Sequence, residues 1–310
     1  MKKIRIRISR KRIVLLCTMV FFLYILGCCL IPPLLVDRQT EEVFTSQIKN
    51  SKEKICLIDD NQDALVWRLR MIREARQKII LTTFELRDDT SGQAIMAALF
   101  DAADRGVSVR VLIDGIDGEI RLNDSQNFTA LCLHENIEVK YYNPFQFTAL
   151  WKVNYRLHDK YLVIDDTAYL LGGRNTHDIY LGDFSASAQA DRDIVVYETN
   201  TGAHNSLDSL CEYFESIWNT EACVLLSDKM GIQKQNEIQN ELKNQLEELI
   251  HHPDYQITPI DWDNETIETA GMLLLTGSAD TNTKDPVIWK ELCQLMRNAK
   301  KEVIFETPLV

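Results

Sequence analysis

Residues 158–175 read HDKYLVIDDTAYLLGGRN, a pattern that predicts a β-hairpin. Two apolar runs, Leu162 to Ile164 and Ala168 to Leu171, are strand-like, and the polar residues between them are typical of a turn. A two-residue turn at Asp166 and Thr167 would fix the pairing of every residue across the two strands.

This register brings three polar side chains together, because it places Asn175 opposite His158 and Gly173 opposite Lys160. His158 and Lys160 are two residues apart, so their side chains share one face of the strand. Gly173 leaves an open space facing the lysine, which suits a phosphate. Asp165 follows Lys160 by an odd step, points to the opposite face, and is interpreted as structural.

The spacing His-x-Lys-x4-Asp-x6-Gly-Gly-x-Asn resembles the signature of the phospholipase D superfamily. The resemblance covers roughly Leu57 to Trp218 and is greatest to the cardiolipin synthase branch. Matching residues outside the spacing itself are Arg156, Asp178, Tyr180, Arg192, Asp193, Phe214 and Trp218.

The resemblance implies a phosphodiester exchange carried out by two such motifs that face each other. One histidine forms a phosphohistidine, and the other acts as acid and then as base. His158 is one of this pair, Lys160 and Asn175 hold the non-bridging oxygens, and Gly172 and Gly173 are structural. The resemblance implies no metal and no cofactor.

A histidine nucleophile must be neutral and oriented, which usually takes a carboxylate on its other ring nitrogen. Asp193, at the start of the next strand, is the candidate for this role. The alternative for Asp193 is a salt bridge with Arg192 or Arg174. For His177, a solvated loop position is favoured over a place on the rim of the cleft.

Residues 1–36 are predicted to be a basic N-terminus and a transmembrane anchor. The first 12 residues hold seven basic side chains and no acidic one, and the 24 residues from Ile13 to Val36 are uncharged, enough to span a bilayer. A cleaved secretory signal, or a lipoprotein signal ending at Cys28, is the alternative. The charge bias puts the N-terminus in the cytoplasm and the remainder outside.

The chain is acidic, with a net charge of −12 that becomes −19 once the seven basic residues of the first 12 are left out. Nucleic-acid binding is dominated by phosphate neutralisation, so no nucleic-acid partner is expected. The cysteines lack the Cys-x2-Cys spacing of a zinc site.

Residues 37–225 alternate strand-like and helix-like segments, which predicts an α/β domain with helices packed on a sheet. The segment 107–114 is apolar enough for a parallel position. Strands are expected at 55–58, 78–86, 107–114, 137–142 and 194–198, and helices at 63–76, 91–105 and 206–218.

Residues 226–310 are predicted to hold a connecting helix and the start of a second, truncated repeat. An apolar stripe from Ile238 to Ile250 favours a surface helix packed on the core over a membrane-lying or partner helix. Residues 75–86 have a counterpart at 299–310, an offset of 224. At that offset a second catalytic histidine would lie at roughly residue 382.

The chain is therefore expected to carry half of an active site. The other half would come from a missing C-terminal repeat or from a homodimer that brings two His158 residues together. The expected function is that of a membrane-anchored phosphatidyltransferase or phospholipase D acting on phospholipids. The alternatives are a nuclease of the same superfamily and a non-catalytic membrane protein that retains the fold.

Overall fold

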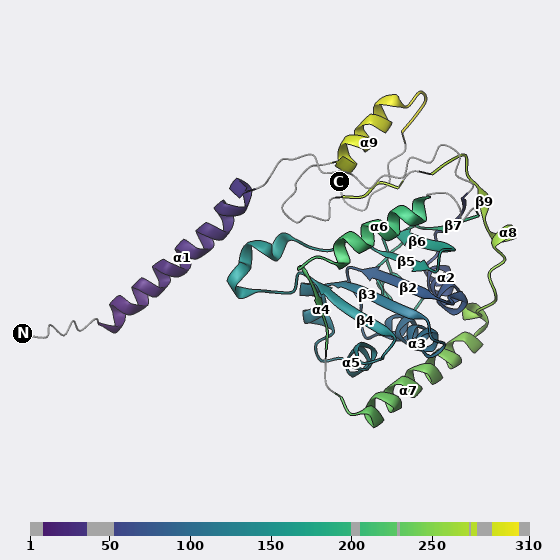
Figure 1. The fold of residues 1–310 in the computed structure, drawn as a ribbon, viewed down its shortest axis with the longest axis horizontal. Coiled ribbons are helices and arrows are strands. Elements are labelled where there is room, and N and C mark those ends of the chain that lie inside the picture. Colours follow the sequence, from purple (N-terminus) through teal and green to yellow (C-terminus); the bar gives the residue numbers. More distant parts are fainter. Residues whose placement is uncertain are drawn as a thin grey trace, which may run out of the picture.

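A mixed β-sheet forms the centre of the computed structural model, which describes residues 9–35, 53–199, 205–227, 230–272, 274–277 and 287–303. The strand order in the described part of the chain is β8-β4-β3-β2-β5-β6-β7-β1-β9 (Figure 1). The strands are β1 (Lys54–Ile58), β2 (Lys78–Thr83), β3 (Ser108–Asp114), β4 (Ile137–Tyr142), β5 (Tyr161–Ile164), β6 (Ala168–Gly172), β7 (Asp193–Tyr197), β8 (Cys223–Leu225) and β9 (Ile267–Glu268).

The central strands are apolar on both faces because helices cover both. β2, β3 and β4 are parallel to one another, while β5, β6 and β7 continue the sheet antiparallel. Successive residues of β2 alternate between two cores: Ile79 and Leu81 pack on one side and Ile80 on the other. This explains the continuous apolar runs in the sequence, and the predicted parallel position of 107–114 is confirmed.

In the described part of the chain, four helices cover one face of the sheet and one helix covers the other (Figure 1). The first group is α2 (Asn61–Glu74), α3 (Thr90–Asp104), α5 (Gln126–Cys132) and α7 (Ile232–His251), and the opposite helix is α6 (Ser206–Trp218). The remaining helical segments are α1 (Arg10–Leu35), α4 (Gly115–Arg121), η1 (Phe147–Asn154), η2 (Pro253–Tyr255), α8 (Trp262–Glu265) and α9 (Val287–Asn298).

The predicted fold class, an α/β sheet flanked by helices after one apolar helix, is confirmed. The helix at 206–218 and the strand at 137–142 have the predicted bounds. The edge strands β8 and β9 were not predicted, because three and two residues carry too little pattern.

The connecting helix α7 packs against the first α/β body. Its buried residues Ile238, Leu242 and Leu246 join the core beneath α3 and α5, so the prediction of a surface helix on the core is confirmed. β9 pairs with β1, so the chain beyond 226 adds to the same sheet. The second-repeat strand predicted near the end lies mostly outside the described residues, at 304–310.

The predicted hairpin register is wrong by one residue. Ile164 pairs with Ala168, so the turn holds three residues and not two. Asp165 adopts a left-handed conformation with φ of 49°, which aspartate tolerates, and its amide donates to the Lys78 carbonyl oxygen of β2. β6 ends at Gly172, whose amide donates to the Lys160 carbonyl oxygen at 3.2 Å. Asn175 therefore does not pair with His158.

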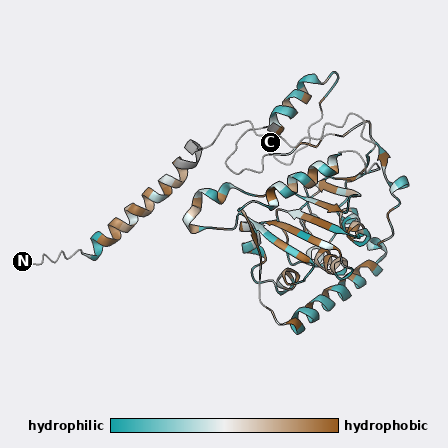
Figure 2. Cartoon of the chain, viewed as in Figure 1, coloured by the Kyte–Doolittle hydropathy of each residue, from teal (hydrophilic) through white to brown (hydrophobic). Residues whose placement is uncertain are grey.

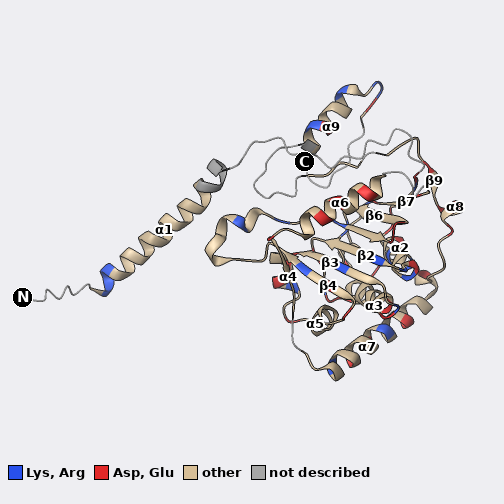
Figure 3. Cartoon of the chain, viewed as in Figure 1, with Lys and Arg blue, Asp and Glu red and all other residues tan. Residues whose placement is uncertain are grey.

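The apolar helix α1 projects away from the α/β body (Figures 1 and 2). Residues Arg10–Leu30 are long and apolar enough to cross a membrane. Its basic side chains lie at the N-terminal end, and the rest of the described helix is uncharged (Figure 3).

Candidate active site

The three polar residues of the motif gather where β2 and β6 end and β5 begins. These strand ends, at one end of the sheet, are called the His158 edge below, which comprises Phe84, His158, Lys160 and Asn175. Phe84 directly follows β2, and its ring centroid lies 5.1 Å from that of His158 and 5.4 Å from the Lys160 Nζ atom. The Phe84 ring thus lies close to both reactive groups.

The His158 imidazole is accessible but partly desolvated. Its pKa is lowered from the usual value, first by burial and then by the positive charge of Lys160. The ring is therefore mostly neutral near pH 7, with a nitrogen lone pair available for attack or for proton transfer.

Lys160 is buried, with 5% of its surface exposed. Burial lowers the pKa of its ammonium to about 8, against the opposing charges of Asp159, Asp191 and Asp114. Its Nζ donates to the His158 carbonyl oxygen at 2.7 Å, which holds the ammonium beside the histidine backbone. An ammonium with three donors and one such bond keeps donors for an anion.

Asn175 reaches this edge through a crossing segment. The Thr176 amide donates to the Glu85 carbonyl oxygen at 2.9 Å, so the chain leaves β6 and pairs beyond the end of β2. β5 lies between those two strands, so the segment passes over its beginning. Asn175 is buried there, and its Oδ1 has no hydrogen-bond partner among the described residues. The structure thus brings His158, Lys160 and Asn175 to one edge.

The predicted open space at Gly173 is occupied. A Cβ atom added there would lie 2.2 Å from an Asp191 carboxylate oxygen, and one added at Gly172 would lie 1.7 Å from Asp193 Oδ1. Both glycines therefore let carboxylates approach the backbone. The sequence did not indicate Asp191, because it lies 31 residues after Lys160 and only the folding of the sheet brings the two side chains close.

Asp193 has partners other than the predicted one. Its Oδ2 accepts from Arg68 Nη1 at 2.9 Å and lies 3.3 Å from Arg174 Nη1, and all three side chains are buried. Among the described contacts of this carboxylate, none joins it to His158. The alternative ion pair with Arg174 is present, and Arg68 is an additional partner that sequence spacing could not show.

Asp165 lies at the far end of the hairpin from His158. Its carboxylate accepts from the backbone amides of Arg76, Gln77 and Lys78 at 2.8 to 3.3 Å. It thereby fastens the hairpin turn to the loop before β2. These contacts are those of a residue that stabilises the local fold.

An arginine and an aspartate position the segment that leads to His158. Arg156 donates from Nε and Nη2 to the Asp114 carboxylate at 2.7 to 3.0 Å, and the Leu157 amide donates to the same group at 3.0 Å. Asp114 ends the parallel strand β3 and caps α4. An aspartate at the carboxyl end of a parallel strand is the feature of the sequence that could have indicated this positioning role.

His177 is buried, so the prediction of a solvated loop position is wrong. Its Nε2 lies 3.2 Å from Glu85 Oε2, and burial lowers its pKa to about 4. The crossing segment carries it inward beside Asn175. In the portion of the chain that the structure describes, no three His, Cys, Asp or Glu side chains are grouped to hold a metal ion.

Comparison with known proteins confirms the resemblance to the cardiolipin synthase branch of the phospholipase D superfamily. The sequence profile described as "Cardiolipin synthase, PLD-like domain" matches residues 69–250, more than half of the chain. An uncharacterised protein of Helicobacter pylori strain J99 is 34% identical over 167 residues, covering 48% of this chain and 32% of the relative. Cardiolipin synthase C of Escherichia coli K12 is 33% identical over 152 residues, covering 44% and 30%.

A solved phosphatidylserine synthase of Haemophilus influenzae aligns with a TM-score of 0.46 at 17% identity, covering 68% of this chain and 48% of that one. The chain spans about a third of the length of the curated relatives that it matches.

Proposed function

The chain belongs to the family of cardiolipin synthase phospholipase D-like domains, and from that premise we propose that it provides a half-site for phosphatidyl transfer or hydrolysis at a membrane. The observation that carries the proposal is that a partly desolvated His158, a buried Lys160 and a buried Asn175 lie at one end of the central strands.

The proposed chemistry uses these groups in two steps. A histidine nitrogen attacks phosphorus, the P–O bond to the leaving alkoxide breaks, and a second histidine donates the proton. An acceptor hydroxyl then loses its proton to that second histidine, its oxygen bonds to phosphorus, and the P–N bond breaks to release the nucleophilic histidine. Lys160 and the Asn175 amide stabilise the negative charge on the non-bridging oxygens throughout. Water as acceptor gives hydrolysis, and a lipid hydroxyl gives transfer.

The segment just before His158 favours a lipid over a nucleic acid. Four apolar side chains in it are exposed, namely Phe145 (50%), Phe147 (66%), Trp151 (38%) and Val153 (37%). The Tyr24 hydroxyl of α1 donates to the Phe147 carbonyl oxygen at 2.7 Å. Exposed apolar side chains beside the motif suit a lipid surface better than a polyanionic nucleic acid.

The second histidine is proposed to come from a further repeat or from a second copy of this chain. The two sources differ in stoichiometry. A stable dimer that is active on its own supports the second copy. A monomer that gains activity only when a downstream extension is present supports the repeat.

The topology proposed is a cytoplasmic N-terminus with the α/β body outside. It follows from the basic residues at the start of α1. Protease added to intact spheroplasts should digest the body, and complete protection would contradict this orientation.

The function is tested with full-length protein reconstituted in liposomes. The protein is incubated with phosphatidylglycerol, with single-stranded DNA, and with neither. Diphosphatidyl lipid, or phosphatidic acid released by hydrolysis, is the expected product. Nicked DNA without lipid turnover would favour the nuclease, and a folded dimer inactive on both substrates would favour a non-catalytic protein.

A further inference from the structure

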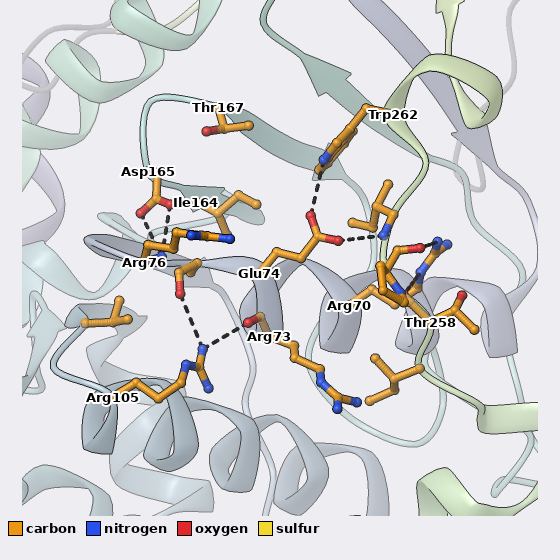
Figure 4. A pocket seen from close by; sticks show the side chains of 15 residues that line it. Arg70, Arg73, Glu74, Arg76, Arg105, Ile164, Asp165, Thr167, Thr258 and Trp262 are labelled. Carbon is orange, nitrogen blue, oxygen red and sulfur yellow. Dashed lines mark hydrogen bonds between the residues drawn. The ribbon is translucent and has the colours of Figure 1, made fainter.

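A cavity of about 840 Å³ lies at the turn end of the β5–β6 hairpin, the end far from His158. Figure 4 shows the side chains that line it. It is bounded by the end of α2, the loop before β2, the end of α3, the β5–β6 turn and the segment 257–262. Four arginines line it: Arg70, Arg73, Arg76 and Arg105. This cavity is called the arginine pocket below.

Two of the arginines are engaged by the protein. Arg70 donates to both carboxylate oxygens of Glu265 at 2.6 Å and to the carbonyl oxygens of Thr258 and Pro259. Arg105 donates to Asp101 and to three carbonyl oxygens at the end of α2. Both side chains therefore build the wall of the pocket.

The other two, Arg73 and Arg76, have uncommitted guanidinium groups. Both residues are exposed, and no side-chain hydrogen bond or ion pair joins either of them to another described residue. They lie on either side of Ala75, at the junction of α2 and β2, and both line the cavity, with their guanidinium groups on different sides of it (Figure 4). Two guanidinium forks are thus free to bind an anion.

The acidic residues of the wall do not take up these forks. Glu74 accepts from the Ile260 amide at 2.5 Å and from Trp262 Nε1 at 3.2 Å. Asp165 accepts from three backbone amides. Backbone amides and the Trp262 indole thus engage both carboxylates, and Asp165 lies beside the Arg76 backbone (Figure 4).

Size and lining indicate the kind of ligand. A planar guanidinium matches the oxygens of phosphate in a bidentate manner. The volume lies within the roughly 300–1,000 Å³ of small-molecule pockets, which exceeds the need of a bare phosphate ion. Val107, Ile257 and Ile260 provide an apolar wall for an organic body.

We propose that the arginine pocket binds a phosphate monoester, with Arg73 and Arg76 holding the phosphate and the apolar wall holding its organic part. This site is separate from the His158 edge, because the strands β2 and β5 run their full length between the two. It is therefore independent of the proposed function.

The test measures binding of glycerol 3-phosphate and of inorganic phosphate to the full-length chain in nonionic detergent. All variants carry Lys160→Ala, which removes the ammonium proposed to bind phosphate at the His158 edge. Arg73→Gln/Arg76→Gln should weaken glycerol 3-phosphate binding at least tenfold. The matched control, Arg297→Gln/Lys300→Gln, removes the same charge from exposed residues at the end of α9 and should leave the affinity unchanged.

Equal affinity in the pocket variant and the control, or no binding in the Lys160→Ala background, would overturn the proposal. The single variants Arg73→Gln and Arg76→Gln, with unfolding midpoints measured, separate a binding loss from a folding defect. Nanodiscs containing phosphatidate give the last arm: competition with glycerol 3-phosphate identifies a lipid headgroup as the source of the phosphate, and its absence identifies a soluble ester.

Discussion

At the beginning of β5 the Lys160 ammonium is buried against Phe84 and has a backbone carbonyl as its described acceptor, whereas at the turn the Asp165 carboxylate accepts from three amides. At one end of the hairpin the Lys160 ammonium thus has hydrogen-bond donors left for a ligand. At the other end the acceptors of the Asp165 carboxylate are already bonded to the backbone. Spare hydrogen-bonding capacity in a buried group lowers stability and suits ligand binding. The predictions below test that division.

Lys160→Ala should lower the rate of turnover more than substitution of Asp193 or Asp165. Loss of the ammonium removes charge stabilisation at phosphorus, so kcat/KM for phosphatidylglycerol should fall by about 1,000-fold, as for other electrostatic donors. Lys160→Arg should not fully restore the rate, because the guanidinium differs in shape and donor geometry. Turnover in liposomes measures both effects. Near-normal turnover by Lys160→Ala would contradict a chemical role for Lys160.

Asp193→Asn should mainly reduce stability. The change leaves the buried Arg68 and Arg174 without their carboxylate, at a cost of about 3–5 kcal/mol for a broken buried pair. The control Asp263→Asn removes an exposed partner of Lys54 and should leave the unfolding midpoint nearly unchanged. Urea unfolding gives both values. An unchanged unfolding midpoint together with a tenfold lower rate per folded molecule would instead support the predicted role of Asp193 in orienting His158.

Asp165→Asn should also act on stability and leave the chemistry intact. An amide oxygen is a weaker acceptor for the Arg76, Gln77 and Lys78 amides, so unfolding free energy should fall by about 1–3 kcal/mol. The rate per folded molecule should stay within a few-fold of wild type. A large loss of rate in well-folded protein would contradict the contrast between the hairpin ends.

The smallest expected effect is a pH-dependent gain from Lys160→Met. The pKa of Lys160 is about 8 in the folded protein, below its usual 10.5, so the unfolded chain binds more protons between those values. Wild-type stability relative to the variant should therefore rise as pH increases from 8 to 10.5. At pH 7 the variant should be more stable by about 1 kcal/mol after allowance for solvent screening. A variant less stable than wild type at pH 7 would show that the buried ammonium is well compensated.

The sequence predicted the strands and the long helices because their apolar patterns extend over whole elements. The predicted hairpin register was wrong by one residue. Whether the turn has two or three residues depends on the backbone conformation of Asp165, which the sequence does not reveal. That shift also misplaced Gly173 and gave Asn175 the wrong neighbour. Asn175 still reaches the His158 edge, by a crossing segment that strand pairing could not predict.

The partners of Asp193 show a different limit. A carboxylate at the start of a strand is visible in the sequence, but Arg68 lies 125 residues before it on α2. Only the packing of α2 on the sheet brings the two together. Asp191 reaches the surroundings of Lys160 in the same way, through the end of the sheet.

The measurement that tests the central assignment most directly is phosphatidylglycerol turnover by His158→Ala in liposomes, with His251→Ala as the matched control. His251 is exposed at the end of α7, so its variant should retain the wild-type rate. His158→Ala should lose at least about 1,000-fold while its unfolding midpoint stays unchanged. Wild-type turnover by His158→Ala would contradict the assignment of this edge of the sheet as a phosphoryl-transfer site.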